Sequence, residues 1–153
     1  MLKEISDFFT ELTGGEKPVS QFAEGDYRLA AAALLVHVAV VDHDLLTDES
    51  RTRLHELLMK RFDLDEAATE QLIDAAVAAD RDAIDLYHFT SLINRTLDDD
   101  GRRRLIEMMW QMACVDGRIS EFEDNILWRV ADLINVPQRE RIEIRRRVAG
   151  ERE

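Results

Sequence analysis

Apolar residues recur every three to four positions along most of the chain, which is the spacing of one face of an α-helix. No segment shows the alternation of apolar and polar residues that a half-buried strand requires. We therefore predict an all-α fold, a single-domain helical bundle of seven or eight helices. The predicted helices cover residues 2–12, 27–41, 47–62, 65–79, 85–97, 102–115, 120–134 and 137–148.

Two of these segments, residues 29–41 and 105–115, are apolar on nearly every side. A helix that is apolar all round is buried on all sides, so these two are predicted to be the central buried helices of the bundle. His37 and Gln111 are the polar exceptions, at equivalent places in the two segments. Each is expected to have a hydrogen-bond partner, because a buried polar group without one is destabilising.

The chain also repeats itself. Each central helix ends in an acidic turn, after which an amphipathic helix begins, so that Val41-Asp42 aligns with Val115-Asp116 at an offset of 74 residues. Phe62 aligns with Ile134 at an offset of 72 residues, so the first copy has the longer turn. Such self-similarity indicates an internal duplication. The duplicated units cover about residues 27–64 and 102–136.

Residues 1–23 lie outside the repeat and are predicted to form an N-terminal accessory helix and a linker. One face of this helix carries apolar residues at helical spacing, namely Ile5, Phe8, Phe9 and Leu12. The segment that contains Gly14-Gly15 ends the helix. The remaining residues, 24–153, form the predicted helical domain.

Composition and charge exclude some classes of function. The 153 residues carry a formal net charge of −12, which argues against nucleic acid because phosphates require a basic surface. The longest apolar run, residues 29–41, is too short to span a bilayer, so no direct membrane insertion is expected. The first residues do not resemble a signal peptide, and the only cysteine, Cys114, fits a reducing compartment. We expect a cytoplasmic protein.

The two acidic turns contain the residues that could carry chemistry. Asp42, Asp44 and Asp116 follow the ends of the central helices, where the partial negative charge of the helix disfavours a carboxylate unless something compensates. A divalent cation would compensate, and oxygen ligands suit Ca²⁺, Mg²⁺ or Mn²⁺. The predicted metal ligands are Asp42, Asp44, Glu49, Asp116 and Glu123.

A purely structural interpretation of the same acids stays open. Ser120 and Glu123 have the spacing of a capping box, and Thr47 is suited to cap the helix that follows it. Asp116 followed by glycine is a common turn dipeptide. Neither turn fits the EF-hand, since the sixth and twelfth positions counted from Asp42 are threonine and arginine rather than glycine and glutamate.

The second turn resembles a known family. The stretch Val115-Asp116-Gly117-Arg118-Ile119-Ser120-Glu121-Phe122-Glu123, preceded by a buried helix and followed by an amphipathic one, looks like the TerB-like family of tellurite resistance proteins. The resemblance covers about residues 24–148, although the first copy has His43 in place of the glycine. It implies a helical bundle whose halves are related by a pseudo-twofold axis. It also implies a metal-associated role in a stress-response complex at the inner face of the bacterial membrane.

Nothing in the sequence specifies an enzyme. No phosphate-binding loop, His-Glu-x-x-His or Cys-x-x-Cys motif is present, and His37 is interpreted as a core histidine with a partner. The leading hypothesis is a non-enzymatic, TerB-like stress-response module that binds a divalent cation through the paired turns. It would act with a protein partner, peripheral to the inner membrane and linked to tellurite resistance. The alternative is a protein-interaction adaptor in which the acids only form caps and turns.

Overall fold

The computed structural model describes residues 22–23, 25–41, 45–115 and 117–152, and this part of the chain forms seven helices and no strand. The prediction of an all-α bundle is confirmed. The predicted helix 2–12 lies outside the described residues. The helices are α2 (Tyr27–Val40), α3 (Asp48–Phe62), α4 (Glu66–Asp82), α5 (Tyr87–Thr96), α6 (Asp99–Ala113), α7 (Glu121–Leu133) and α8 (Gln138–Arg152).

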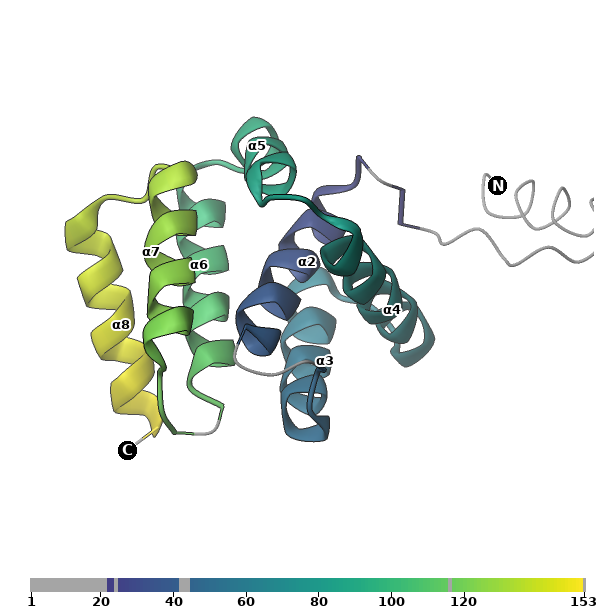
Figure 1. The fold of residues 1–153 in the computed structure, drawn as a ribbon, viewed down its shortest axis with the longest axis horizontal. Helices are drawn as coiled ribbons and strands as arrows, with labels where there is room; N and C mark the ends of the chain where they lie inside the picture. Colours follow the sequence, from purple (N-terminus) through teal and green to yellow (C-terminus); the bar gives the residue numbers. More distant parts are fainter. Residues whose placement is uncertain (1–21, 24, 42–44, 116, 153) are drawn as a thin grey trace, which may run out of the picture.

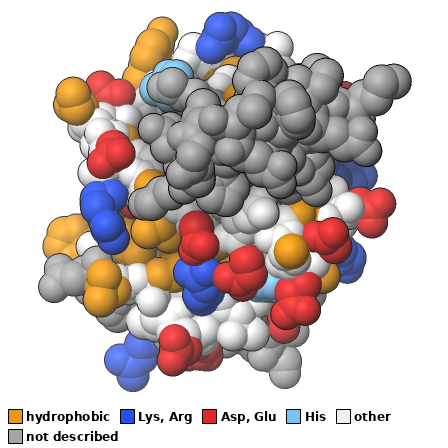
Figure 2. All heavy atoms as spheres, turned by 90° about the vertical axis from the view of Figure 1, so that its right-hand side faces the viewer, with side chains coloured by type: hydrophobic (Ala, Val, Ile, Leu, Met, Phe, Trp, Pro, Cys, Tyr) orange, Lys and Arg blue, Asp and Glu red, His pale blue; other side chains and the backbone are white. Residues whose placement is uncertain are grey.

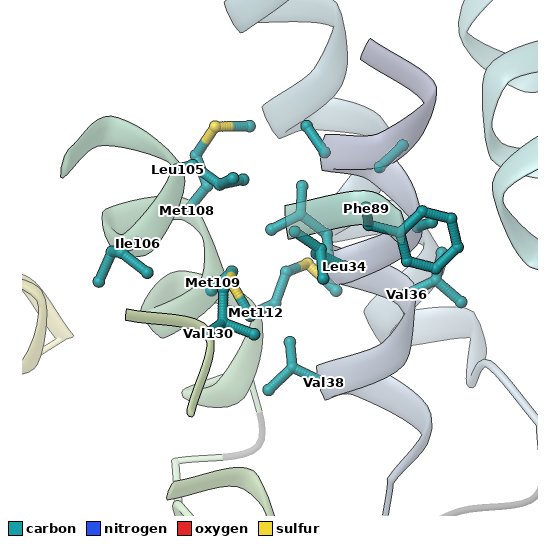
Figure 3. Close-up of a cluster of buried hydrophobic side chains, with 14 of the residues drawn as sticks. Leu34, Val36, Val38, Phe89, Leu105, Ile106, Met108, Met109, Met112 and Val130 are labelled. Carbon is teal, nitrogen blue, oxygen red and sulfur yellow. The ribbon is translucent and has the colours of Figure 1, made fainter. Parts of the chain in front are cut away.

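Helix α2 is the centre of the bundle, as predicted from its apolar sequence. Ten of its fourteen residues are buried, and it contacts α3, α4, α5, α6 and α7. Figure 1 shows it between α3 and α4 on one side and α6, α7 and α8 on the other. In the close-up of Figure 3, Leu34 and Val38 of α2 face Met109 and Met112 of α6. The second predicted central helix therefore packs directly against the first.

The first turn of α2 contains an ion pair. The Asp26 side chain caps the helix by accepting from the Arg28 backbone N–H at 2.9 Å, and its other oxygen lies 2.7 Å from Arg28 Nη2. Burial alone would raise the pKa of the Asp26 carboxyl. The hydrogen bonds and positive charge of Arg28 outweigh that effect and hold the pKa below its ordinary value.

Helix α6 begins earlier than the predicted residue 102. Asp98 caps it by accepting from the Gly101 N–H at 2.8 Å, and Asp99 and Asp100 lie in the first turn, where the helix dipole favours acids. Gly101 is inside the helix, where a Cβ would lie 3.2 Å from Leu97 Cβ. The glycine thus allows a close approach and does not end a helix.

Helices α2 and α3 form an antiparallel pair. The ring of Tyr27, at the start of α2, meets the ring of Phe62, at the end of α3, edge to face with centroids 5.8 Å apart. The beginning of α3 therefore lies near the end of α2. Figure 1 shows the same arrangement for α6 and α7.

Helix α8 covers the second unit. Ile144 and Val148 are buried, and Arg145 and Arg141 place their guanidinium groups over the rings of Trp110 and Trp128, at 5.4 and 5.2 Å from the centroids. These contacts are cation–π interactions. The helix continues to Arg152, beyond the predicted end at Val148.

At the opposite end of the bundle, which α3 and α4 form, α4 and the connections on either side of it are acidic. Residues 63–85 contain eight acids and one base, Arg81. Arg51 of α3 joins the two helices by pairing with Glu70 at 2.7 Å and Asp74 at 2.9 Å. Figure 2 views this side and shows acidic side chains on it, with Lys, Arg and hydrophobic side chains beside them. Within the described residues, no helix has the length and apolarity needed to cross a membrane.

Candidate functional site

The ends of four helices meet around one small cavity of about 170 Å³. Two of these helices, α2 and α3, belong to the first repeat unit, and two, α6 and α7, belong to the second. Ala39 and Ala113, which are equivalent in the repeat, lie on its wall. The full lining comprises Ala39, Thr47, Glu49, Ser50, Met112, Ala113, Val115 and Glu123. The cavity therefore depends on both units.

In the first unit, Thr47 caps α3 as predicted. Its hydroxyl accepts from the Ser50 N–H at 3.1 Å, and Ser50 itself is buried. Glu49 is the second residue of the helix and is exposed. The favourable field of the helix N-terminus stabilises this carboxylate, which takes no part in the cap.

In the second unit, the predicted capping box is confirmed. The Ser120 N–H donates to Glu123 Oε1 at 2.9 Å, and the Glu123 N–H donates to Ser120 Oγ at 3.0 Å. Glu123 is only 9% exposed. A carboxylate can accept about four hydrogen bonds or metal contacts, and the capping bond from the Ser120 N–H is one of those that Glu123 makes. The structure thus holds this side chain in one orientation at the wall of the cavity.

Two of the five predicted ligands, Glu49 and Glu123, come together in the lining of this cavity although they are 74 residues apart. Asp42, Asp44 and Asp116 lie outside the described residues, and their role as ligands stays a prediction. Within the described ranges, no group of three or more His, Cys, Asp or Glu side chains could hold a metal ion. The described part of the site thus contributes two carboxylates.

These side chains fit a hard cation. Carboxylate and hydroxyl oxygens are the donors that Ca²⁺, Mg²⁺ and Mn²⁺ prefer. A space of 170 Å³ accommodates an ion with a few waters, each of which takes about 30 Å³ in the liquid. Two helix N-termini and two helix C-termini border the cavity, so their opposite partial charges offset one another.

His37 has the predicted hydrogen-bond partner. Its Nδ1 atom lies 2.7 Å from Asp80 Oδ1, which joins α2 to the last turn of α4. The ring is not fully buried, since 30% of the side chain is exposed. It lies on the wall of an open hollow of about 520 Å³ that Tyr87 and Arg129 also line. The expectation of a satisfied histidine is confirmed, and the expectation of a core position is not.

Sequence comparison identifies a relationship for most of the chain. The family model described as Tellurite resistance protein TerB matches residues 28–146. Neither the curated proteins nor the solved structures contain a significant match. The family match spans both repeat units and confirms the resemblance seen in the second acidic turn.

Proposed function

Because the chain belongs to the TerB family of tellurite resistance proteins, we propose that it is a non-enzymatic module that binds a divalent cation between its two acidic turns. Family membership supports a module associated with tellurite resistance. Binding of a divalent cation is a more specific proposal than family membership alone supports.

One observation supports the cation most directly. Glu49 and Glu123 belong to different repeat units, and both line the same small cavity. Two carboxylates brought near one space repel each other, and a positive charge between them would offset that repulsion. A bound cation supplies that charge.

The proposed ligand set combines fixed and adjustable groups. Glu123 is held by its cap, whereas Glu49 is exposed. Asp42, Asp44 and Asp116 follow the ends of α2 and α6 in the sequence and complete the set. An all-oxygen site of this kind favours Ca²⁺, with Mg²⁺ and Mn²⁺ as the alternatives. The bound ion would link the two units at one end of the bundle.

Calorimetric titration of the purified protein with Ca²⁺, Mg²⁺ and Mn²⁺ tests the proposal. We expect saturable binding of at least one ion. Replacing Glu49 and Glu123 by glutamine should weaken it by about tenfold or more each, because each change removes a charged ligand while keeping the shape. The Glu123→Gln variant can still cap the helix, since glutamine also serves in capping boxes. The combined change Asp42→Asn and Asp116→Asn should abolish binding.

Matched controls come from the same two helices. Asp48→Asn and Glu121→Gln remove exposed first-turn acids that do not line the cavity. These variants should bind the ion as the wild type does. The cation proposal fails if no ion binds saturably, or if the control variants weaken binding as much as the cavity variants do.

The adaptor function is the competing proposal, and the capping geometry favours it. Thr47, Ser120 and Glu123 already have a sufficient structural role as caps. An adaptor would lose stability in Ser120→Ala and gain none from any divalent ion. Thermal unfolding with and without ions therefore separates the two functions.

For the cellular role, we propose that the module acts with a protein partner in a stress-response assembly at the inner face of the membrane. Support comes from the family and from the acidic sequence of α4, which suits a basic partner. Crosslinking in cells exposed to tellurite, followed by membrane fractionation, tests it. The same partner must be recovered with the wild type and lost when the acids of α4 are neutralised.

A further inference from the structure

The connection between α4 and α5 exposes two large apolar side chains. Ile84 is 101% exposed and Tyr87 is 67% exposed, although they are only three residues apart. Leu86, between them, is buried and fixes the connection to the core. Exposed apolar residues that occur together mark a surface that another chain segment covers.

A hollow lies beside these residues. It has a volume of about 510 Å³, and its wall includes Leu29, Ala30, Ala79, Ile84 and Phe89. Asp82, Asp85 and His88 also border it. The hollow thus has apolar walls with polar groups beside them, which is the form of a groove that accepts an amphipathic helix.

The chain enters the described structure close to this hollow. Leu29 and Ala30 lie in the first turn of α2, only seven and eight residues after Phe22. Phe22 is buried, and the Arg28 guanidinium lies 4.7 Å from the centroid of its ring. Phe22 is therefore fixed at the start of α2, the helix whose Leu29 and Ala30 line the hollow.

Residues 2–12 have the matching pattern. Ile5, Phe8, Phe9 and Leu12 recur at helical spacing, while the acids among these residues, Glu4, Asp7 and Glu11, follow a separate stripe. Residues 13–21 connect this segment to Phe22 and reach about 30 Å when extended. That length is sufficient for residues 2–12 to reach the hollow, with their acids directed away from Asp82 and Asp85.

We propose that residues 2–12 dock as a helix on the hollow between α2, α4 and α5 of the same chain and cover Ile84. The short connection keeps the segment at a high effective concentration at its own hollow, which favours this contact over one with a second copy.

Hydrogen exchange of the full chain tests the docking. In the wild type, amides of residues 5–12 should be protected. Ile84→Asp should accelerate their exchange by about tenfold or more, because it places a charge in the contact. Ile84 has no buried surface, so the fold should be retained, and circular dichroism checks this. The matched control is Phe122→Asp, at a 64% exposed site on α7, which should leave residues 5–12 unchanged.

The reciprocal variant carries Phe8→Asp and Phe9→Asp. It should accelerate the exchange of residues 84–89 while leaving α6 and α7 as they are. Protection in the wild type should also be independent of dilution. The proposal is overturned if residues 5–12 are unprotected, if Ile84→Asp and Phe122→Asp act alike, or if dilution removes the protection, which would identify a second copy as the occupant.

Discussion

The two repeat units build the same structure with different degrees of constraint. In the second unit, Ser120 and Glu123 exchange two hydrogen bonds and Glu123 is buried. In the first unit, Thr47 makes a single capping bond, and the position equivalent to the box glutamate, counted from the cap, is Ser50. The acid that reaches the cavity is instead Glu49, one position earlier and exposed.

This difference separates two roles of a glutamate in the first turn of a helix, namely capping the helix and lining the cavity, which the sequence pattern does not distinguish. A glutamate that belongs to a capping box is needed for the fold, whatever it binds. A glutamate that lines the same cavity without capping anything contributes to the fold only through the favourable field of the helix N-terminus. Substitution of Glu49 is therefore the more specific test of cation binding, and substitution of Glu123 is the more specific test of the stability of the fold.

The largest effect is expected in the core that both units share. Leu35 of α2 and Met109 of α6 are equivalent in the repeat and fully buried. Each change to alanine should destabilise the protein by about 2–5 kcal/mol. Leu35→Ala should be the more severe, because methionine is more flexible and its surroundings adapt more readily to a loss of volume. Urea unfolding measures both, and equal or inverted losses would contradict the assumption that the surroundings of the methionine adapt more readily.

Cation binding should produce the next largest effect. An ion at a hundred times its dissociation constant stabilises the folded state by about 2.7 kcal/mol. Thermal unfolding with Ca²⁺ and then with excess chelator measures this gain. Glu49→Gln should lose about half of the gain or more, in line with the weaker binding, while leaving the stability of the ion-free protein nearly unchanged. A Glu49→Gln variant that keeps the full gain would place the ion elsewhere.

The caps allow the two units to be compared directly. Thr47→Ala and Ser120→Ala should each destabilise the protein by about 1 kcal/mol. Ser120→Ala should be the more severe, since the Ser120 side chain belongs to a reciprocal pair of bonds and the Thr47 side chain does not. Urea unfolding in the presence of chelator measures this difference without any contribution from ions. An equal loss would mean that the second bond of the box adds nothing.

The smallest effect concerns acid stability at the start of α2. The pKa of Asp26 is lowered from its ordinary value of 3.8, so its contribution is fully present above that pH and is lost as the pH falls through the lower, folded-state pKa. Asp26→Asn should be nearly neutral at pH 7, because asparagine is also a good cap. The variant should show a shallower loss of stability in acid. Unfolding curves at a series of acidic pH values check this, and parallel curves for the two proteins would contradict it.

Most of the fold follows from the sequence because the signals are local. Thr47 and Ser120 are caps whose identity depends on a few neighbouring residues, and both are confirmed. The start of α6 lies three residues before its predicted position, since Asp98 to Gly101 has the composition of a turn. The close contact between Gly101 and Leu97 explains why this glycine lies within a helix, and no local pattern reveals such a contact.

The candidate site is harder to predict from the sequence because it depends on how the helices pack against one another. Alignment of the repeats selects Glu49 and Glu123, but only the packing of α2 and α3 against α6 and α7 brings them to one cavity. The open hollow beside His37 is not expected from the sequence either. A histidine within an apolar helix is expected to be buried, and only the position of α4 leaves one side of the ring accessible.

The two tryptophans, each stacked against an arginine, give the second unit a fluorescence signal of its own. The chain has two tryptophans, and both Trp110 and Trp128 lie in α6 and α7 beneath α8. Intrinsic fluorescence therefore reports on the release of α8 from this half and is insensitive to fraying of α3 and α4, whereas circular dichroism at 222 nm averages over every helix. Superimposable transitions from the two probes would mean that the halves unfold as one cooperative unit. Separated transitions would mean that the duplicated units retain some of the independence of two smaller proteins.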